Sequence, residues 1–518
     1  MGDVRRAVRR RQRLGWLLRV NRLLGARSHY ARLKKFAAEF AREGRLRATV
    51  ATFSRWETGL STVSYRAVRR YEQVLGLPGH ALVSVIDTVS RYLSASPDAA
   101  PLLTRPRTPE PERRTEELVD RACGGDVMTA NDWDDLTNIL ACHPGIVLSP
   151  RRLWTDLSER LLYETSIADG VLWMRRAEAL NRLIAHPAGQ HAAISTIAAA
   201  AADRSVQSMV GMVSVFESSV HDTANIHVIR HLTDPTTDRT FYGALLASVR
   251  KLRYGHFSAA QLRKLVPVIV DILAEGRGGA RLSLAATLLR MIPAEMRQRI
   301  NARIWDMAAE KLERTSTQSR VVERLCHETV ANLDAERTFN DQILPHLLDE
   351  LMFDPNFDVR LYSAFLLYST PYRAPLGRAL NRELVAVRPT TPIAVTLLEA
   401  LRILGGPDER RHIERLVVAP GIPGPVRDTA ASALGHVGGS SSDGYWRSAL
   451  SAARRRWHQT QADAEISVLD RVIYSLGMGG QQALLRTVTA DPTLPDRLRS
   501  AANWWTTLPA HIRDSARS

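Results

Sequence analysis

The sequence predicts an all-α protein, and three observations lead to that prediction. Apolar residues recur at helical spacing along most of the 518 residues, for example at Leu82, Val85, Ile86 and Val89. Proline and glycine punctuate these segments, as they do at helix ends. From Glu116 onward no stretch shows a convincing alternation of apolar and polar residues, which would indicate strands.

A proline-rich segment divides the chain. Residues 94–115 carry prolines at positions 97, 101, 106, 109 and 111. Prolines at this density interrupt helices and favour a semi-extended tether. We therefore predict a domain at residues 1–93 that comprises a basic arm and a small helical domain, a linker at 94–115, and a helical domain at 116–518.

The composition limits the class of protein. The chain is 45% hydrophobic and is too long for one compact core, so more than one domain is expected. Its longest uncharged runs, such as 192–202 and 206–216, are too short to span a bilayer. The cysteines Cys123, Cys142 and Cys326 lie far apart, which argues against a disulfide framework or a zinc knuckle. We expect a cytoplasmic protein without membrane contacts.

The positive charge is concentrated in the amino-terminal fifth. Residues 1–95 hold 20 basic and 6 acidic residues, whereas the other 423 residues hold 50 and 48. A general arginine bias would spread evenly along the chain. The concentration is instead typical of a module that binds a polyanion, with a basic arm at Arg5 to Arg13 that we expect to be disordered when free.

The stretch 49–59 reads as one short helix with two faces. Phe53, Trp56 and Leu60 form an apolar stripe at i, i+3 and i+7, which predicts burial. Thr49 can cap the start of the helix, and Gly59 permits the backbone conformation that ends it. The opposite face, with Val50, Ala51, Ser54 and Arg55, is left for a partner.

The motif Ser54-Arg-Trp-Glu-Thr-Gly59, preceded by Thr49 and Thr52, resembles the recognition helix of Cro/repressor-type (XRE-like) helix-turn-helix domains. The resemblance covers residues 14–93 and implies five helices, of which the third reads double-stranded DNA in the major groove, with the protein usually acting as a homodimer. The turn before Thr49 is longer than in that family. The DNA-binding residues that we predict are Thr49, Val50, Ala51, Thr52, Ser54 and Arg55 on the third helix, Arg45 and Arg47 before it, and Lys34 and Lys35 on the second helix.

Internal similarity marks the carboxy-terminal region. Arg360, Arg427 and Arg497 each begin an Arg-x-x-small-Ala motif, and the string Pro425 to Gly435 resembles the second helix of a HEAT repeat. The resemblance implies an α-solenoid in which stacked helix pairs bury faces that one pair cannot bury alone.

Motifs of catalysis are scarce. The chain has no glycine-rich phosphate loop, no Ser/His/Asp signature and no paired-cysteine metal motif, so we expect neither an enzyme nor a cofactor. His227 and His231 have the i, i+4 spacing of metal ligands but no third ligand at fixed spacing, and we predict no metal site. A HEAT-like DNA glycosylase is an alternative, with Trp504, Trp505 and Asp496 around a flipped nucleotide.

These observations predict a bacterial-type, nucleoid-associated transcription regulator. Its helix-turn-helix domain would bind DNA in a sequence-specific manner. Its repeat domain would dimerise, sense an effector or recruit a partner. An interaction scaffold, in which the repeats bind a protein and the basic module only localises it, remains the main alternative.

Overall fold

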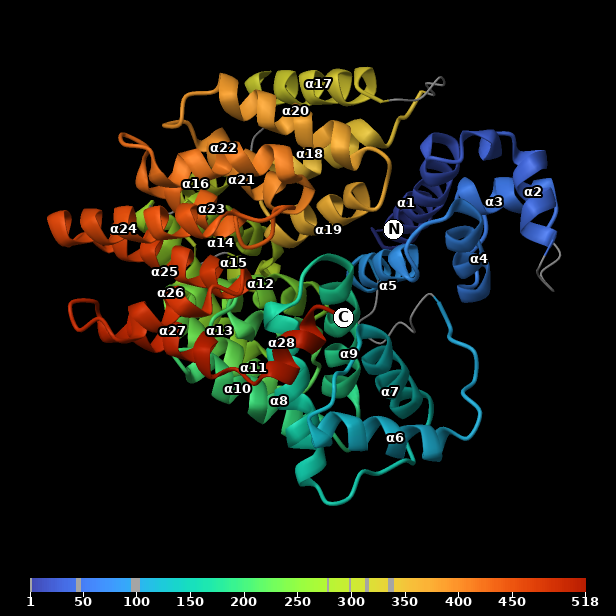
Figure 1. Cartoon of the computed structure of the whole chain (residues 1–518), viewed down its shortest axis with the longest axis horizontal. Helices are drawn as coiled ribbons and strands as arrows, with labels where there is room; N and C mark the ends of the chain where they lie inside the picture. The colour runs from blue at the N-terminus through green and yellow to red at the C-terminus, as the bar shows by residue number, and fades with distance from the viewer. Residues whose placement is uncertain are drawn as a thin grey trace. The chain divides into compact units, whose positions relative to one another are not determined.

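The computed structural model describes residues 2–42, 48–94, 103–276, 279–297, 300–312, 316–333 and 340–518, without the side chains of residues 2–9, 28 and 310–312. Over these residues the chain is built from helices and contains no strand, which confirms the all-α prediction (Figure 1). The chain divides into two compact units. The first unit comprises Met1–Arg107, Thr317–Phe353 and Val359–Gln481, and the second comprises Thr108–Ser316, Asp354–Asp358 and Gln482–Ser518.

Within its described residues, the basic segment at the amino terminus forms five α-helices and one 3-10 turn. They are α1 (Gly2–Leu24), η1 (Ser28–Ala31), α2 (Leu33–Arg42), α3 (Val50–Glu57), α4 (Tyr65–Leu75) and α5 (Ala81–Tyr92). The expected disordered arm differs from this structure, because α1 runs back to Gly2. No proline interrupts that segment, and its arginine, alanine and leucine residues favour helix.

The proline-rich segment is only partly a tether. Arg105 donates to Asp87 at 2.6 Å and lies over the ring of Tyr65, so the residues after position 102 pack back onto the amino-terminal helices. Helix α6 (Pro111–Gly124) begins inside the predicted linker. A proline in the first turn of a helix loses no hydrogen bond, so Pro111 starts this helix rather than preventing it.

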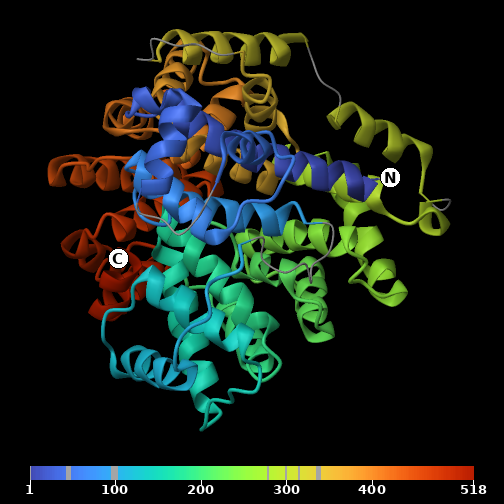
Figure 2. The ribbon, with the colours of Figure 1, turned by 90° about the vertical axis from the view of Figure 1, so that its right-hand side faces the viewer.

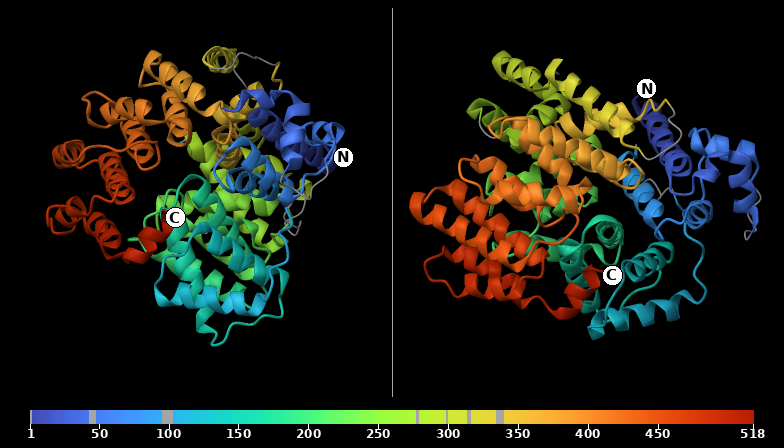
Figure 3. Two further views of the ribbon diagram at one scale, coloured as in Figure 1. Left: turned by 45° about the vertical axis from the view of Figure 1, so that its right-hand side comes forward. Right: turned by 45° about the horizontal axis from the view of Figure 1, so that its top comes forward.

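Among the remaining helices of the first unit, α20 to α25 stack in two rows. The helices from residue 316 to 478 are α17 (Ser316–Ala331), α18 (Leu344–Phe353), α19 (Phe357–Tyr368), α20 (Arg373–Ala386), α21 (Pro392–Leu404), α22 (Pro407–Val418), α23 (Gly424–Ala433), α24 (Asp443–Thr460) and α25 (Asp463–Met478). Helices α20, α22 and α24 follow one another in one row, and α21, α23 and α25 in the other (Figure 3). Each helix of the first row pairs with the next helix in sequence, an arrangement that fits an α-solenoid.

Repeated polar contacts accompany this stacking. Arg360 bonds to Glu399 at 3.0 Å and Arg427 bonds to Glu465, so two of the repeated arginines reach a glutamate 39 and 38 residues further along. Arg456, from the basic run 454–456, donates to the carbonyls of Val417, Val418 and Ala419 at the end of α22. These arginines therefore join successive helices instead of forming a basic surface.

The second unit is a separate helical assembly. Besides α6 it contains α7 (Ala130–Cys142), α8 (Arg152–Ile167), α9 (Gly170–Ala185), α10 (Gln190–Ala202), η2 (Met212–Ser218), α11 (Asp222–Thr233), α12 (Asp238–Arg253), α13 (Ala259–Glu275), α14 (Gly279–Met291), α15 (Ala294–Arg297), α16 (Ala302–Leu312), α26 (Gln482–Thr489), α27 (Asp496–Thr507) and α28 (Ala510–Ala516). Helix α7 packs on α9, and α8 packs on both α9 and α10, drawn in teal to green in Figure 2, while α28 returns to pack on α8.

A buried lysine ties η2 and α11 to α12. Lys251 is fully buried, and its Nζ donates to the carbonyl of Ser219 and to Oδ1 of Asn225, both at 2.7 Å. Burial lowers the pKa of Lys251 to about 7. A neutral amine still carries two donors, which is enough for both acceptors.

Candidate nucleic-acid interface

Helix α3 has both ends defined by local contacts. The hydroxyl of Thr49 accepts from the amide of Thr52 at 3.3 Å, and the hydroxyl of Thr52 accepts from the amide of Thr49 at 3.3 Å. This reciprocal capping box satisfies two amides at the helix start. Beyond Glu57, Gly59 takes a φ of +73°, a left-handed conformation that favours glycine. The predicted caps are confirmed.

The inner side of α3 packs into an aromatic cluster. The ring of Phe53 lies 5.3 Å from Phe36 and 4.9 Å from Phe40 on α2, and 6.0 Å from Tyr71 on α4. Trp56 adjoins Phe53 edge-on at 5.4 Å. Leu60, which was expected to continue this stripe, is 71% exposed, so that part of the prediction is wrong. The helix has already ended at Glu57, and the helical spacing no longer applies to Leu60.

A buried ion pair anchors α3 to α1. Glu57 accepts from Nε and Nη2 of Arg22 at 2.7 and 2.6 Å, and the side chains of both residues are about 5% exposed. The Tyr71 hydroxyl also donates to Glu57 at 3.2 Å, and burial, followed by the Glu57 charge, raises the pKa of Tyr71. Glu57 belongs to the motif that drew attention to this helix. Its structural role was missed because Arg22 lies 35 residues away and nothing in the spacing pairs them.

Two glycines bring the backbones of α1 and α3 together. A Cβ on Gly15 would lie 2.6 Å from the carbonyl oxygen of Trp56 and 2.7 Å from the amide nitrogen of Gly59. A Cβ on Gly59 would lie 2.6 Å from the carbonyl of Arg11. Helix α1 therefore crosses directly against the end of α3 and fixes its position.

The outer side of α3 carries most of the predicted DNA-binding residues. Thr49, Val50, Ala51, Ser54 and Arg55 are exposed together along it, whereas Thr52 is half-buried and its hydroxyl is engaged in the cap. Within the described residues, no ion pair or side-chain hydrogen bond holds Arg55.

The other predicted contacts lie outside α3. Lys34 and Lys35 are exposed on α2, which packs against α3. Arg45 and Arg47 lie outside the described residues. The structure thus places eight of the ten predicted residues, five of them on the exposed side of one helix.

Several arginines of the basic segment serve the fold itself. Arg70 is 8% exposed and donates to the carbonyls of Phe40 and Glu39 in the last turn of α2. Arg27 donates to the carbonyl of Val74 near the end of α4. The net charge of the segment therefore suggests more free basic side chains at its surface than the structure has.

Helix α1 also packs against the repeat helices of the first unit. Nε1 of Trp16 donates to the Asp341 carboxylate at 2.8 and 2.9 Å, and the Tyr372 hydroxyl donates to the same carboxylate at 2.9 Å. Arg13 pairs with Glu350 at 2.5 Å. The helix that fixes α3 is thus held on its other side by residues more than 300 positions away, in contrast to the expected flexible tether.

No family model, curated protein or solved structure matches this chain. The interface therefore rests on its own geometry and on the motif resemblance.

The other sites suggested by the sequence are not assembled. His231 is buried and the His227 ring stacks on Phe216, and burial lowers the pKa of both histidines. No group of three or more His, Cys, Asp or Glu side chains suited to a metal occurs among the described residues.

The residues considered for a glycosylase differ in their exposure to solvent. Trp505 is 1% exposed, whereas the Asp496 side chain is 89% exposed and pairs with Arg499. One of the two side chains is therefore buried and the other is in an exposed ion pair. In the described part of the chain, no helix combines the length and apolarity needed to cross a membrane.

Proposed function

We propose that the protein is a sequence-specific DNA-binding transcription regulator that presents the outer side of α3 to the major groove. The supporting observation is the division of α3 into two sides. Phe53 and Glu57 are buried and fix the helix, while Ser54 and Arg55 are exposed together with Val50 and Ala51. A rigidly held, exposed helix in the most basic segment of a chain suits groove binding.

The chemistry of this side limits how it reads sequence. Arg55 can donate two hydrogen bonds to guanine or bind a phosphate, and Ser54 can bind a phosphate or a base edge. Val50 and Ala51 can only contact thymine methyl groups. We therefore propose that Lys34 and Lys35 supply phosphate contacts, and that a second copy of the chain supplies the remaining specificity through a repeated half-site.

The test uses the full chain and a random duplex library. Selection should enrich a defined motif, and the affinity for that motif should fall steeply as salt rises. Arg55→Ala should weaken binding to the motif by about 1–3 kcal/mol. Arg113→Ala removes the same charge from an exposed side chain on α6 and is the matched control, for which we expect unchanged affinity.

A second candidate, an interaction scaffold, is supported by the two stacked rows from α20 to α25. One experimental result distinguishes the two functions. If the folded full chain binds no duplex even at low salt, the DNA-binding proposal fails and the scaffold is favoured. If Arg55→Ala and Arg113→Ala bind DNA equally well, Arg55 is removed from the interface.

A further inference from the structure

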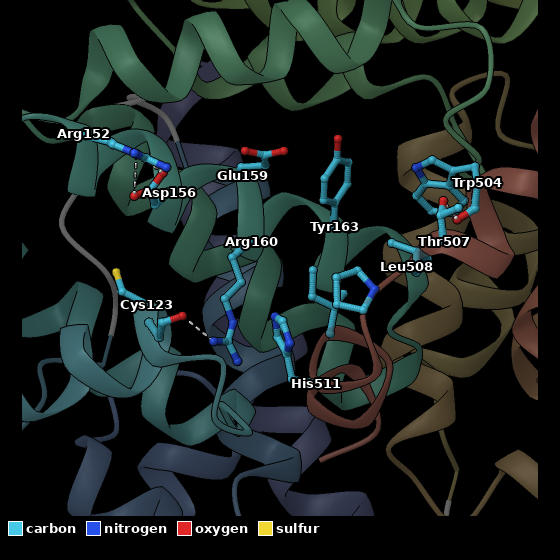
Figure 4. A pocket seen from close by; sticks show the side chains of 13 residues that line it. Cys123, Arg152, Asp156, Glu159, Arg160, Tyr163, Trp504, Thr507, Leu508 and His511 are labelled. Carbon is cyan, nitrogen blue, oxygen red and sulfur yellow. Dashed lines mark hydrogen bonds and ion pairs between the residues drawn. The ribbon is translucent and has the colours of Figure 1, made fainter.

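The second unit contains a pocket of about 480 Å³ between α8, the end of α6, and the junction of α27 and α28 (Figure 4). Helix α8 contributes Arg152, Asp156, Glu159 and Tyr163, which follow one another at i, i+4, i+7 and i+11 and so share one side of the helix. Trp504 lies across from them. The volume falls within the range of small-molecule sites.

Two basic groups of the pocket, Arg160 and His511, are engaged or neutral. Arg160 is buried, bonds to Glu164 at 2.9 Å, and also donates to the carbonyls of Ala122 and Asp126. Burial and the neighbouring Arg160 lower the pKa of His511, so its ring is neutral near pH 7. Neither group is left to attract an anion.

The carboxylates of the pocket are more available to a ligand than its buried arginine. Glu159 is exposed, and within the described residues no hydrogen bond or ion pair engages it. Among the described residues, the ion-pair partner of Asp156 is Arg152, at 3.4 Å, and the Arg152 side chain is 83% exposed. Such a pair contributes little and can open. Burial raises the pKa of the Tyr163 hydroxyl, and the nearby negative charge of Glu159 raises it further.

Two aromatic rings complete the surroundings. Tyr163 meets Trp504 edge-to-face, with ring centroids 6.1 Å apart. Trp504 is largely buried, and Leu508 beside it adds apolar wall. A cation gains energy over the face of Tyr or Trp, and an adjacent carboxylate adds to that preference.

We propose that this pocket binds a small organic cation with an alkylammonium or quaternary ammonium group, with Glu159 as its counter-ion and the rings of Tyr163 and Trp504 as its walls. Neutral ligands lack the charge that these groups favour. Anions face the unpaired carboxylate. The pocket belongs to the second unit and α3 to the first, and the proposal does not depend on whether α3 binds DNA.

The test compares two probes of nearly the same shape. Choline carries a quaternary ammonium, and 3,3-dimethyl-1-butanol is its neutral counterpart. Ligand-observed NMR and calorimetry on the full chain should show that choline binds at least about fivefold more tightly than the alcohol, and less tightly at high salt. Equal affinity for the two probes, or no saturable choline binding, would overturn the proposal.

Variants locate the site. Glu159→Gln should reduce the preference for choline over the alcohol without disturbing the fold, because its side chain is exposed. Tyr163→Leu should weaken choline binding with no change in net charge. Glu116→Gln, exposed on α6 and outside the pocket, should leave both affinities unchanged. Choline binding that persists unaltered in both Glu159→Gln and Tyr163→Leu would place the ligand elsewhere and refute the assignment.

Discussion

Replacing Glu57 by glutamine should loosen α3 from the helix that holds it. The substitution preserves the shape of the side chain and an acceptor for the Tyr71 hydroxyl, which lies 3.2 Å from the carboxylate. It removes the negative charge of the carboxylate that accepts two hydrogen bonds from Arg22, of 2.6 and 2.7 Å. Arg22 would then be a buried cation without a counter-ion.

The magnitude follows from the burial of the pair. Removing one partner of a buried ion pair typically costs about 3–5 kcal/mol. Arg22 keeps two acceptors, the carbonyls of Tyr30 and Ala31 at 3.2 and 2.6 Å. We therefore expect the lower end of that range, about 3 kcal/mol.

Hydrogen exchange of the full chain measures this loss locally. A cost of about 3 kcal/mol should accelerate exchange of the α3 amides by roughly 100-fold. The double variant Arg22→Met/Glu57→Gln removes both charges and should exchange more slowly than Glu57→Gln alone, because no unpaired cation remains. Exchange of α3 in Glu57→Gln within about threefold of the wild type, or strictly additive effects in the double variant, would refute the reasoning.

Two further predictions concern close packing and pH. Gly15→Ala should destabilise the first unit by about 2 kcal/mol in hydrogen exchange, because the new methyl group would meet the backbone of Trp56 at 2.6 Å. Gly279→Ala is the control, because a Cβ there would have nothing within 4 Å. Equal stability of the two variants would contradict the contact. For Lys251 the pKa is about 7 in the fold and ordinary in the unfolded chain, so the unfolded chain binds more protons between about pH 7 and 10. Thermal unfolding measures the difference in stability between the wild type and Lys251→Met. This difference should rise with pH by up to about 1.4 kcal/mol per pH unit in that window and stay level below it. A difference that stays flat or falls within the window would contradict the lowered pKa of Lys251.

Local chemistry made much of α3 predictable from the sequence. The capping threonine, the terminal glycine and the buried Phe53 all follow from residues within one or two turns of the helix. Helix α4 follows the same local chemistry, because Ser64 caps its start and Gly76 ends it in a left-handed conformation. Helical spacing failed at Leu60 because a period applies only while the helix continues.

The long-range contacts could not be predicted in this way. Arg70 adds to the charge of the basic segment, yet it donates to carbonyls in the last turn of α2, 30 and 31 residues away. Trp16 donates to Asp341, which lies 325 residues away. One sequence without relatives holds no signal that links such positions.

The two sets of contacts on α1 suggest how the first unit works as a whole. At 100° per residue, Gly15 and Arg22 lie on nearly the same side of the helix, and Arg13 lies on the opposite side. The first side holds α3 through Glu57 and the glycine contact. The second holds Glu350 on α18 and Asp341 just before that helix. A shift of α18 would therefore have to carry α1, and α3 with it, or break a buried contact on one side. In the proposed regulator, a partner of the repeats could alter the presentation of α3 without touching DNA.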